Sequence, residues 1–151
     1  MSEYRGCELP EDLWYDLDYL WVRPDAGAED TFTVGLTDPA QTIAGRVVSV
    51  LLRKPGTHRR VGKHLGVLES GKWVGGVPAP FDTTIVEINP RLESEPGLVN
   101  VAPYGDAWLM RLRPDDVAAA YARLKRGDEA IVALKAWIDK YNLQCMRCTD
   151  Q

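Results

Sequence analysis

Residues 63–80 read KHLGVLESGKWVGGVPAP, and this stretch decides the fold. Residues 63–70 mix apolar and polar side chains as a short strand does, and residues 73–80 begin a second run of that kind. Lys72 lies between the two runs, so we expect a hairpin with this lysine at its exposed tip. Gly71 before it permits a positive φ at little cost. A lysine so placed is free to be modified, which makes Lys72 the first candidate for the chemistry of the protein.

Short alternating runs punctuated by Gly and Pro continue on both sides of this hairpin, from residue 31 to residue 113. Residues 46–52, 83–88 and 107–112 are typical of strands. A weak internal repeat relates residues 44–50 to residues 79–87, so that two similar halves flank Lys72. The pattern predicts a mainly β protein, a flattened β-sandwich in which the Lys72 hairpin links the two sheets.

Helical patterns are expected on both flanks of the β region. Pro10 fits the first turn of a short leading helix over residues 10–15. After Pro114, apolar residues recur every three to four positions from Val117 to Ile138, with Gly127 between two such runs. This spacing predicts one or two helices over residues 114–143. We expect residues 1–151 to form one domain, with its β core at about residues 19–113.

Composition favours a folded cytoplasmic protein. Hydrophobic residues make up 45% of the chain, enough to bury a core. No apolar run approaches the roughly 20 residues of a membrane span, and the first residues do not lead into a signal-peptide core. The net charge of −4 argues against a nucleic-acid surface. We therefore expect a cytoplasmic location, without a membrane or nucleic-acid partner.

One basic segment contrasts with this acidic balance, and it contains Arg53, Lys54, His58, Arg59 and Arg60. A solvated loop is the first interpretation of the segment, and a docking site for an acidic partner is the second. His58 and His64 are the only histidines, and neither lies near a nucleophile motif such as Gly-x-Ser-x-Gly. We therefore expect no catalytic residue.

The three cysteines are too few and too near the termini for the disulfide framework of a secreted protein. Cys145 and Cys148 form a Cys-x-x-Cys pair with three interpretations: an idle tail, a redox-active dithiol, or part of a metal site. No second pair and no nearby histidine completes a metal site, so we expect no metal.

Several blocks of the chain resemble the H protein of the glycine cleavage system, a relative of lipoyl domains. The family motif Glu-Ser-Val-Lys-Ala carries lipoate on its lysine, and here it corresponds to Glu69-Ser70-Gly71-Lys72-Trp73. The other matching blocks are residues 19–22, 33–41, 44–48, 86–89, 92–100 and 103–109. The resemblance implies the lipoyl-domain fold, a barrel-sandwich hybrid, with lipoate attached to Lys72. It also implies a carrier protein that serves partner enzymes and is not itself an enzyme.

A lipoyl group on Lys72 would place a five-membered dithiolane ring about a dozen ångströms from the backbone, at the end of a flexible chain. Its disulfide exchanges with thiols, and a released thiol can hold a group while the arm moves between active sites. Glu69 and Ser70 offer an acceptor and a hydroxyl to a modifying enzyme. Trp73 follows the lysine on the expected tip, where it would contact the arm or a partner.

Most other aromatic residues are expected to pack in the core or at its edge, namely Trp14, Tyr15, Tyr19, Trp21 and Trp108.

Two departures from the family pattern bear on the cargo. The family's glutamate in His-Glu-Trp-Val falls on Leu20, and a second acidic residue, four positions after the modified lysine, falls on Gly76. These carboxylates are thought to hold the amine of the aminomethyl-loaded arm, and neither leucine nor glycine can do so. The chain therefore looks more like the lipoate-binding proteins of sulfur oxidation, whose arm carries a sulfur intermediate.

The resemblance also implies partners. In the sulfur-oxidation interpretation they are a heterodisulfide-reductase-like complex, enzymes of lipoate attachment or assembly, and dihydrolipoamide dehydrogenase. In the alternative, glycine cleavage, they are glycine decarboxylase and aminomethyltransferase. In the sulfur-oxidation interpretation, Cys145 and Cys148 would also pair with each other or exchange with the dihydrolipoyl thiols.

Overall fold

The computed structural model describes residues 2–145. Its strands are β1 (Ser2–Tyr4), β2 (Cys7–Leu9), β3 (Trp14–Tyr15), β4 (Leu20–Asp25), β5 (Ala28–Leu36), β6 (Val47–Leu52), β7 (His58–Arg59), β8 (His64–Ser70), β9 (Val74–Pro78), β10 (Thr83–Ile88), β11 (Met110–Pro114) and β12 (Lys125–Arg126). Its helices are α1 (Asp38–Ala44), α2 (Leu98–Val101), α3 (Val117–Ala122) and α4 (Gly127–Lys140).

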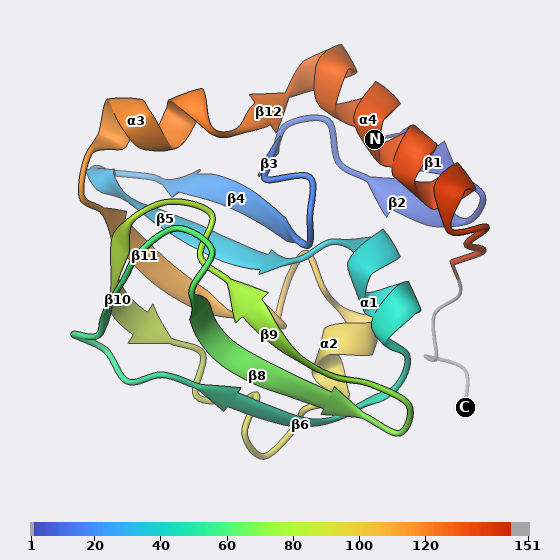
Figure 1. The fold of residues 1–151 in the computed structure, drawn as a ribbon, viewed down its shortest axis with the longest axis horizontal. Coiled ribbons are helices and arrows are strands. Elements are labelled where there is room, and N and C mark those ends of the chain that lie inside the picture. The colour runs from blue at the N-terminus through green and yellow to red at the C-terminus, as the bar shows by residue number, and fades with distance from the viewer. Residues whose placement is uncertain (1, 146–151) are drawn as a thin grey trace.

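The strands form a large sheet, a small sheet and a terminal hairpin. The large sheet has the order β12-β3-β4-β5-β11-β10-β7, the small sheet has the order β6-β8-β9, and β1 pairs with β2. The small sheet lies on one side of β4 and β5, and helices α3 and α4 lie on the other (Figure 1). The prediction of a mainly β, sandwich-like protein is confirmed.

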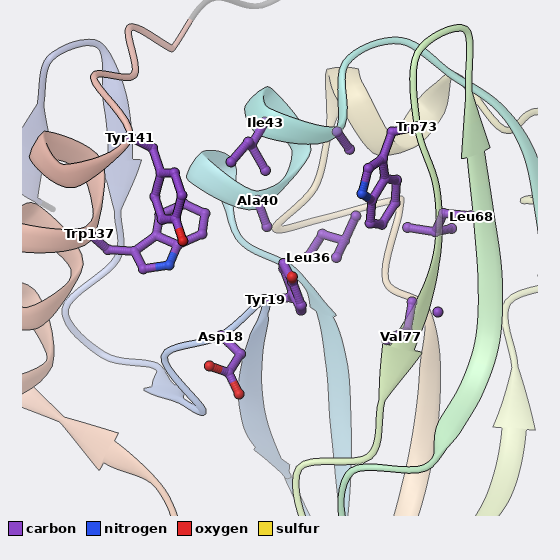
Figure 2. A pocket seen from close by; sticks show the side chains of 12 residues that line it. Asp18, Tyr19, Leu36, Ala40, Ile43, Leu68, Trp73, Val77, Trp137 and Tyr141 are labelled. Atoms are coloured by element: carbon purple, nitrogen blue, oxygen red, sulfur yellow. The ribbon is translucent and has the colours of Figure 1, made fainter.

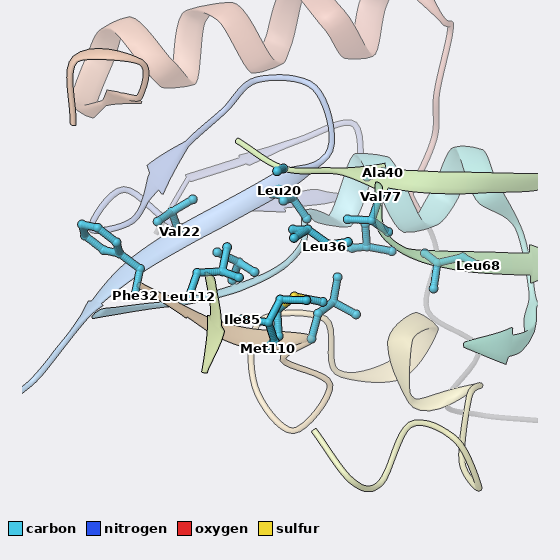
Figure 3. Packing of buried hydrophobic residues seen from close by; sticks show 14 of the residues in the cluster. Leu20, Val22, Phe32, Leu36, Ala40, Leu68, Val77, Ile85, Met110 and Leu112 are labelled. Carbon is cyan, nitrogen blue, oxygen red and sulfur yellow. The ribbon is translucent and has the colours of Figure 1, made fainter. Parts of the chain in front are cut away.

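Strand β4 sends alternate side chains into two different cores. Leu20 and Val22 join the cluster between the two sheets, together with Leu68 of β8 and Val77 of β9 (Figure 3). Trp21, between them in sequence, is fully buried in a second cluster with residues of α4. Because successive side chains of a strand point to opposite faces, one short apolar run covers both cores.

The hairpin that carries Lys72 does not join the two sheets. β8 and β9 pair with each other inside the small sheet, from His64 opposite Pro78 to Glu69 opposite Val74. The prediction of a hairpin at Lys72 is confirmed, but its placement between the sheets is wrong. The chain passes from the small to the large sheet later, between β9 and β10.

The leading helix expected over residues 10–15 is also wrong. Trp14 and Tyr15 instead form β3, which pairs with β4 and β12. The Tyr15 hydroxyl donates to the carbonyl of Pro10, which holds the preceding turn. Tertiary pairing therefore outweighs the helical signal of Pro10. The last strand, predicted over residues 107–112, is β11, and it begins at Met110, two residues after Trp108.

Both C-terminal helices are present, and two further helices, α1 and α2, were missed. Helix α4 begins at Gly127, whose φ of 64° lies outside the helical region, so the chain does not continue as one helix from α3. Helix α1 begins at a Thr-Asp-Pro signal in which the Thr37 hydroxyl accepts from the backbone N–H of Ala40 at 3.1 Å. That capping pattern with Pro39 in the first turn is the signal that could have predicted α1.

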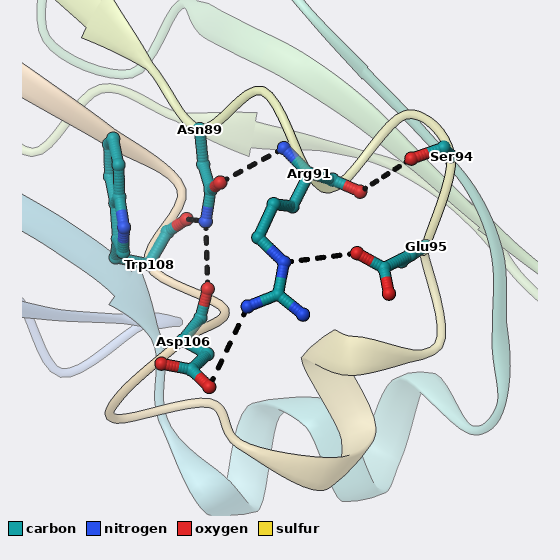
Figure 4. Close-up of polar contacts among 6 residues, drawn as sticks. All are labelled: Asn89, Arg91, Ser94, Glu95, Asp106 and Trp108. Atoms are coloured by element: carbon teal, nitrogen blue, oxygen red, sulfur yellow. Dashed lines mark hydrogen bonds and ion pairs between the residues drawn. The ribbon is translucent and has the colours of Figure 1, made fainter.

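Hydrogen bonds from Asn89 stabilise the long loop between β10 and β11 (Figure 4). The Asn89 side-chain amide donates to the carbonyls of Asp106 and Trp108, at 2.8 Å each. Arg91 Nε contacts the carboxylate of Glu95 at 3.0 Å. These contacts fix the loop that contains α2, and α2 contacts the turn at Gly45. Within residues 2–145, no helix is long and apolar enough to cross a membrane.

Candidate functional site

Ser70 builds the turn that presents Lys72. The Ser70 backbone N–H donates to the carbonyl of Trp73 at 2.7 Å. Its hydroxyl donates to the same carbonyl and accepts from the Lys72 N–H, at 3.3 Å each. Ser70 is buried and Lys72 is exposed. The serine hydroxyl thus serves the hairpin itself, and Gly71 forms the turn without a positive φ.

The Lys72 side chain lies along Gly45, the residue that ends α1. A Cβ built on Gly45 would lie 2.7 Å from Lys72 Cε, and Gly45 has φ of 82°. Both facts favour glycine at this position. The aliphatic part of the lysine therefore crosses the turn between α1 and β6.

Asn100 of α2 holds that turn in place. Its side-chain oxygen accepts from the Val47 N–H at 2.8 Å. Its amide nitrogen donates to the Gly45 carbonyl at 2.8 Å and to Gln41 Oε1 at 2.9 Å. Asn100 is buried, so these hydrogen bonds fix the backbone under the lysine.

A cavity of about 330 Å³ borders this turn (Figure 2). Ala44 and Trp73, the chain neighbours of Gly45 and Lys72, both line it. The remaining lining residues are Asp18, Tyr19, Leu36, Ala40, Ile43, Leu68, Gly76, Val77, Trp137 and Tyr141. The walls are mostly apolar and aromatic, so the cavity suits a neutral ligand with little polarity.

Trp73 is one wall of the cavity and not an exposed tip. A Cβ on Gly75 would lie 2.2 Å from Trp73 Cζ2, so the indole packs directly against the glycine backbone. The ring also contacts the core between the sheets and is only partly exposed. Trp73 therefore lies where it could contact an arm on Lys72, and the backbone of Gly75 gives its ring a surface to cover.

Trp137 and Tyr141 form the opposite wall, from α4 and the residue after it (Figure 2). Their ring centroids lie 4.9 Å apart. Neither residue is among the candidates predicted from the sequence. Their spacing of four places them on one helix face, which is the signal that could have found them.

Leu20 and Gly76 replace the two family carboxylates, and side chains at these two positions point to different parts of the fold. Leu20 is fully buried in the core between the sheets. A Cβ on Gly76 would lie 2.2 Å from the ring of His64, so that ring occupies the space of a side chain at position 76. Neither residue supplies an acidic group to the cavity.

Asp18 does supply one carboxylate to the lining of the cavity. It lies at the edge of the cavity near Tyr19 (Figure 2). Its backbone is held by Asp16, whose Oδ1 accepts from the N–H groups of Asp18, Tyr19 and Leu20 at 2.9, 3.1 and 2.9 Å. Burial raises the pKa of Asp16 to about 6, although these hydrogen bonds act in the opposite direction.

The cysteines do not pair as expected. Cys145 forms a disulfide with Cys7, with their Cα atoms 4.8 Å apart. Cys148 lies outside the described residues. The disulfide joins β2 to the segment after α4, and the Cys145 N–H also donates to the Arg5 carbonyl at 3.0 Å. The proposed Cys145–Cys148 pair and the free tail at Cys145 are therefore wrong. Within residues 2–145, no group of three metal-binding side chains is present.

The other expected aromatic positions are confirmed as packing residues. Tyr15 and Trp21 are fully buried, whereas Trp14, Tyr19 and Trp108 pack at the margins of the two clusters.

The family model described as glycine cleavage H-protein matches residues 13–136. The chain belongs to this family. It is 41% identical over 150 residues to glycine cleavage system H protein 3 of Aquifex aeolicus, covering 97% of this chain and 92% of that protein. It is 38% identical over 146 residues to H protein 2 of the same organism, covering 96% and 89%.

A solved structure agrees with this assignment. The crystal structure of a glycine cleavage system H protein from Mycobacterium marinum superposes with a TM-score of 0.71 at 28% identity, covering 89% of this chain and all of that chain. H proteins are carriers that hold lipoate covalently on a lysine.

The residues around Lys72 fit such a group. The lysine is exposed, Gly45 leaves room beside its side chain, and an apolar cavity borders the same turn. An extended apolar chain ending in a dithiolane ring is the kind of ligand that such walls can cover.

Proposed function

We propose that Lys72 is the lipoyl attachment site and that the chain works as a lipoyl carrier serving partner enzymes. The observation that carries this proposal is the exposed lysine at the tip of the β8–β9 hairpin, beside the apolar cavity. When bound, lipoate supplies a dithiolane that exchanges with thiols and holds a transferred group. Glu69, Gly71 and Trp73 are the flanking residues proposed for recognition.

The chain's own residues do three things in this proposal. Ser70 and Asn100 hold the hairpin and the turn beside it, so that Lys72 Nζ faces a modifying enzyme. The apolar walls exclude water from a resting arm. The exposed hairpin leaves the lysine accessible to the active sites of partners in the cytoplasm, which remains the proposed location.

Intact mass tests the attachment. The unmodified protein is incubated with lipoate, ATP and a lipoate–protein ligase, and the gain of one lipoyl group is measured. We expect the gain in the parent chain and in Lys63→Ala, and its absence in Lys72→Ala. Lys63 is an exposed lysine in front of the same hairpin strand, so it is a matched control. Modification of Lys72→Ala would contradict the proposal.

The first candidate cargo is the aminomethyl group of glycine cleavage, with glycine decarboxylase and aminomethyltransferase as partners. The names of the related proteins support this candidate. Asp18 supports it too, because a carboxylate at the edge of the cavity can accept a hydrogen bond from a charged amine.

The second candidate is a sulfur intermediate, with a heterodisulfide-reductase-like complex as partner. It is favoured by Leu20 and Gly76, which replace the two family carboxylates, and by the aromatic walls of the cavity.

Aminomethyl loading distinguishes these candidates. Lipoylated parent, Asp18→Asn and the exposed control Asp12→Asn are each incubated with purified glycine decarboxylase and glycine. For aminomethyl cargo, the parent loads and Asp18→Asn loses roughly 1.5–3 kcal/mol of arm stabilisation, about a tenfold to hundredfold effect, whereas Asp12→Asn does not. For sulfur cargo, the parent itself loads poorly. Its reduced arm instead takes the outer sulfur of an added low-molecular-weight persulfide, which leaves as the corresponding thiol, and this occurs in all three proteins.

A further inference from the structure

The outer face of the small sheet has exposed apolar side chains beside Lys72, and the exposed Glu69 lies among them, opposite Val74. Leu51 of β6 lies directly opposite Val67 of β8, and their side chains are 62% and 38% exposed. Val74 of β9, two residues after Lys72, is 66% exposed. The adjacent residues Val50 and Leu68 point inward and are buried. Exposed apolar side chains in register on one sheet face are unusual without a partner to cover them.

A pair of arginines borders the far end of this face. Arg53 Nε and Arg59 Nε both donate to the carbonyl of His64, at 3.0 Å each. The two Nε atoms therefore lie no farther apart than twice that distance. Within residues 2–145, neither guanidinium forms an ion pair. Two cations held this close repel each other, and a carboxylate bound between them would relieve the repulsion.

The surrounding segment strengthens this positive charge. Residues 53–64 contain five lysines and arginines and no acidic residue, although the whole chain has a net charge of −4. The acidic groups that reach the segment contact other atoms in it: Asp115 pairs with His58 at 2.8 Å, and Asp82 accepts from the Val61 N–H at 2.8 Å. These acidic groups therefore do not neutralise the arginine pair, and its positive charge is available to a partner.

The arginine pair and Lys72 lie at opposite ends of one strand. β8 begins at His64 and ends at Ser70, a length of roughly 20 Å at the usual rise per residue. A standard protein interface covers roughly 800 Å² on each partner, which is wide enough to include both ends. A protein seated on this face would therefore touch the arginines, the Leu51–Val67 pair and the hairpin at once.

We propose that this face, Arg53 and Arg59 with Leu51, Val67 and Val74, docks the enzyme that attaches lipoate to Lys72, through carboxylates on that enzyme. This inference rests on the proposed attachment at Lys72. The attaching enzyme is the one partner that a lipoyl carrier meets whatever its cargo, and it must approach the hairpin closely. The arginines bind its carboxylates and fix its orientation, and the apolar pair excludes water between them.

Lipoylation kinetics test the surface. The probe is the purified lipoate–protein ligase of the same organism, and initial rates are measured against the concentration of unmodified carrier. The double variant Arg53→Glu/Arg59→Glu should raise KM for the carrier about tenfold or more with kcat unchanged, because rim charges act mainly on encounter. Leu51→Ser should raise KM as well. The matched control Arg23→Glu/Arg123→Glu makes the same charge change at exposed residues elsewhere and should leave KM unchanged.

The outcomes separate the two proposals. Salt should raise KM for the parent and have much less effect on the arginine double variant. A KM for that variant within twofold of the control's would overturn the docking surface while leaving Lys72 attachment intact. Failure of the parent to gain a lipoyl group would overturn both. Binding of the parent to vesicles containing anionic lipid, lost in the arginine variant while KM is unchanged, would also overturn the enzyme-docking role.

Discussion

Lys72 crosses the backbone of Gly45, so that a methyl group at position 45 would lie 2.7 Å from Lys72 Cε. Gly45→Ala should destabilise the protein by about 1–2 kcal/mol, because alanine is strained at φ of 82°. It should also displace the lysine and slow lipoylation. Stability is measured by urea unfolding, and lipoylation by intact mass over time.

Gly27→Ala is the matched control for that change. Gly27 has φ of 77°, but nothing lies within 4 Å of its Cβ position. It should lose similar stability and keep the parent rate of lipoylation. Equal rates in the two variants would show that the contact between Gly45 and the lysine does not affect the modification.

The sequence predicts the hairpin well and the cavity poorly. Residues 63–80 show local alternation, so the strands on either side of Lys72 follow from neighbouring residues alone. The cavity is built from residues that are far apart in sequence, such as Asp18, Trp73 and Trp137, and no local period brings them together. The same limit applies to Cys7 and Cys145, which are 138 positions apart and whose pairing depends on the packing of α4.

Asn100 should be the most sensitive of the residues that hold the site. Asn100→Ala removes the acceptor for the Val47 N–H and the donors to Gly45 and Gln41. Because these groups are buried, the loss should cost about 2–4 kcal/mol in urea unfolding. Asn100→Asp keeps the acceptor but not the donors, and should still lose most of this stability. Ser94→Ala, which removes one exposed hydrogen bond, should change stability by less than about 0.5 kcal/mol.

The pH dependence of stability should reveal Asp16. Its folded pKa, raised to about 6, lies above the value of an unfolded aspartate, so the folded state binds the proton more tightly. The stability from this group is fully present below pH 4 and is lost as the pH rises through 6. A pKa shift of this size changes the free energy of unfolding by roughly 2–3 kcal/mol between low and neutral pH.

Asp16→Asn separates charge from hydrogen bonding at this position. The asparagine oxygen can still accept from Asp18, Tyr19 and Leu20 but does not titrate. Unfolding measured between pH 4 and 7 should therefore lose the Asp16 contribution to the slope, while the fold is kept. An unchanged slope in this variant would assign the pH dependence to other groups.

The disulfide between Cys7 and Cys145 should stabilise α4 and, through it, the far wall of the cavity. It closes a loop of 138 residues, for which chain entropy predicts about 4–5 kcal/mol. Cys7→Ser, or reduction of the parent with dithiothreitol, should lower the unfolding free energy by up to that amount and expose Trp137 to water, seen as a red shift in fluorescence. Cys148→Ser should leave both readings unchanged. Peptide mapping of the oxidised protein without reductant should recover a linked Cys7–Cys145 peptide, and free alkylation of both cysteines would refute the assignment.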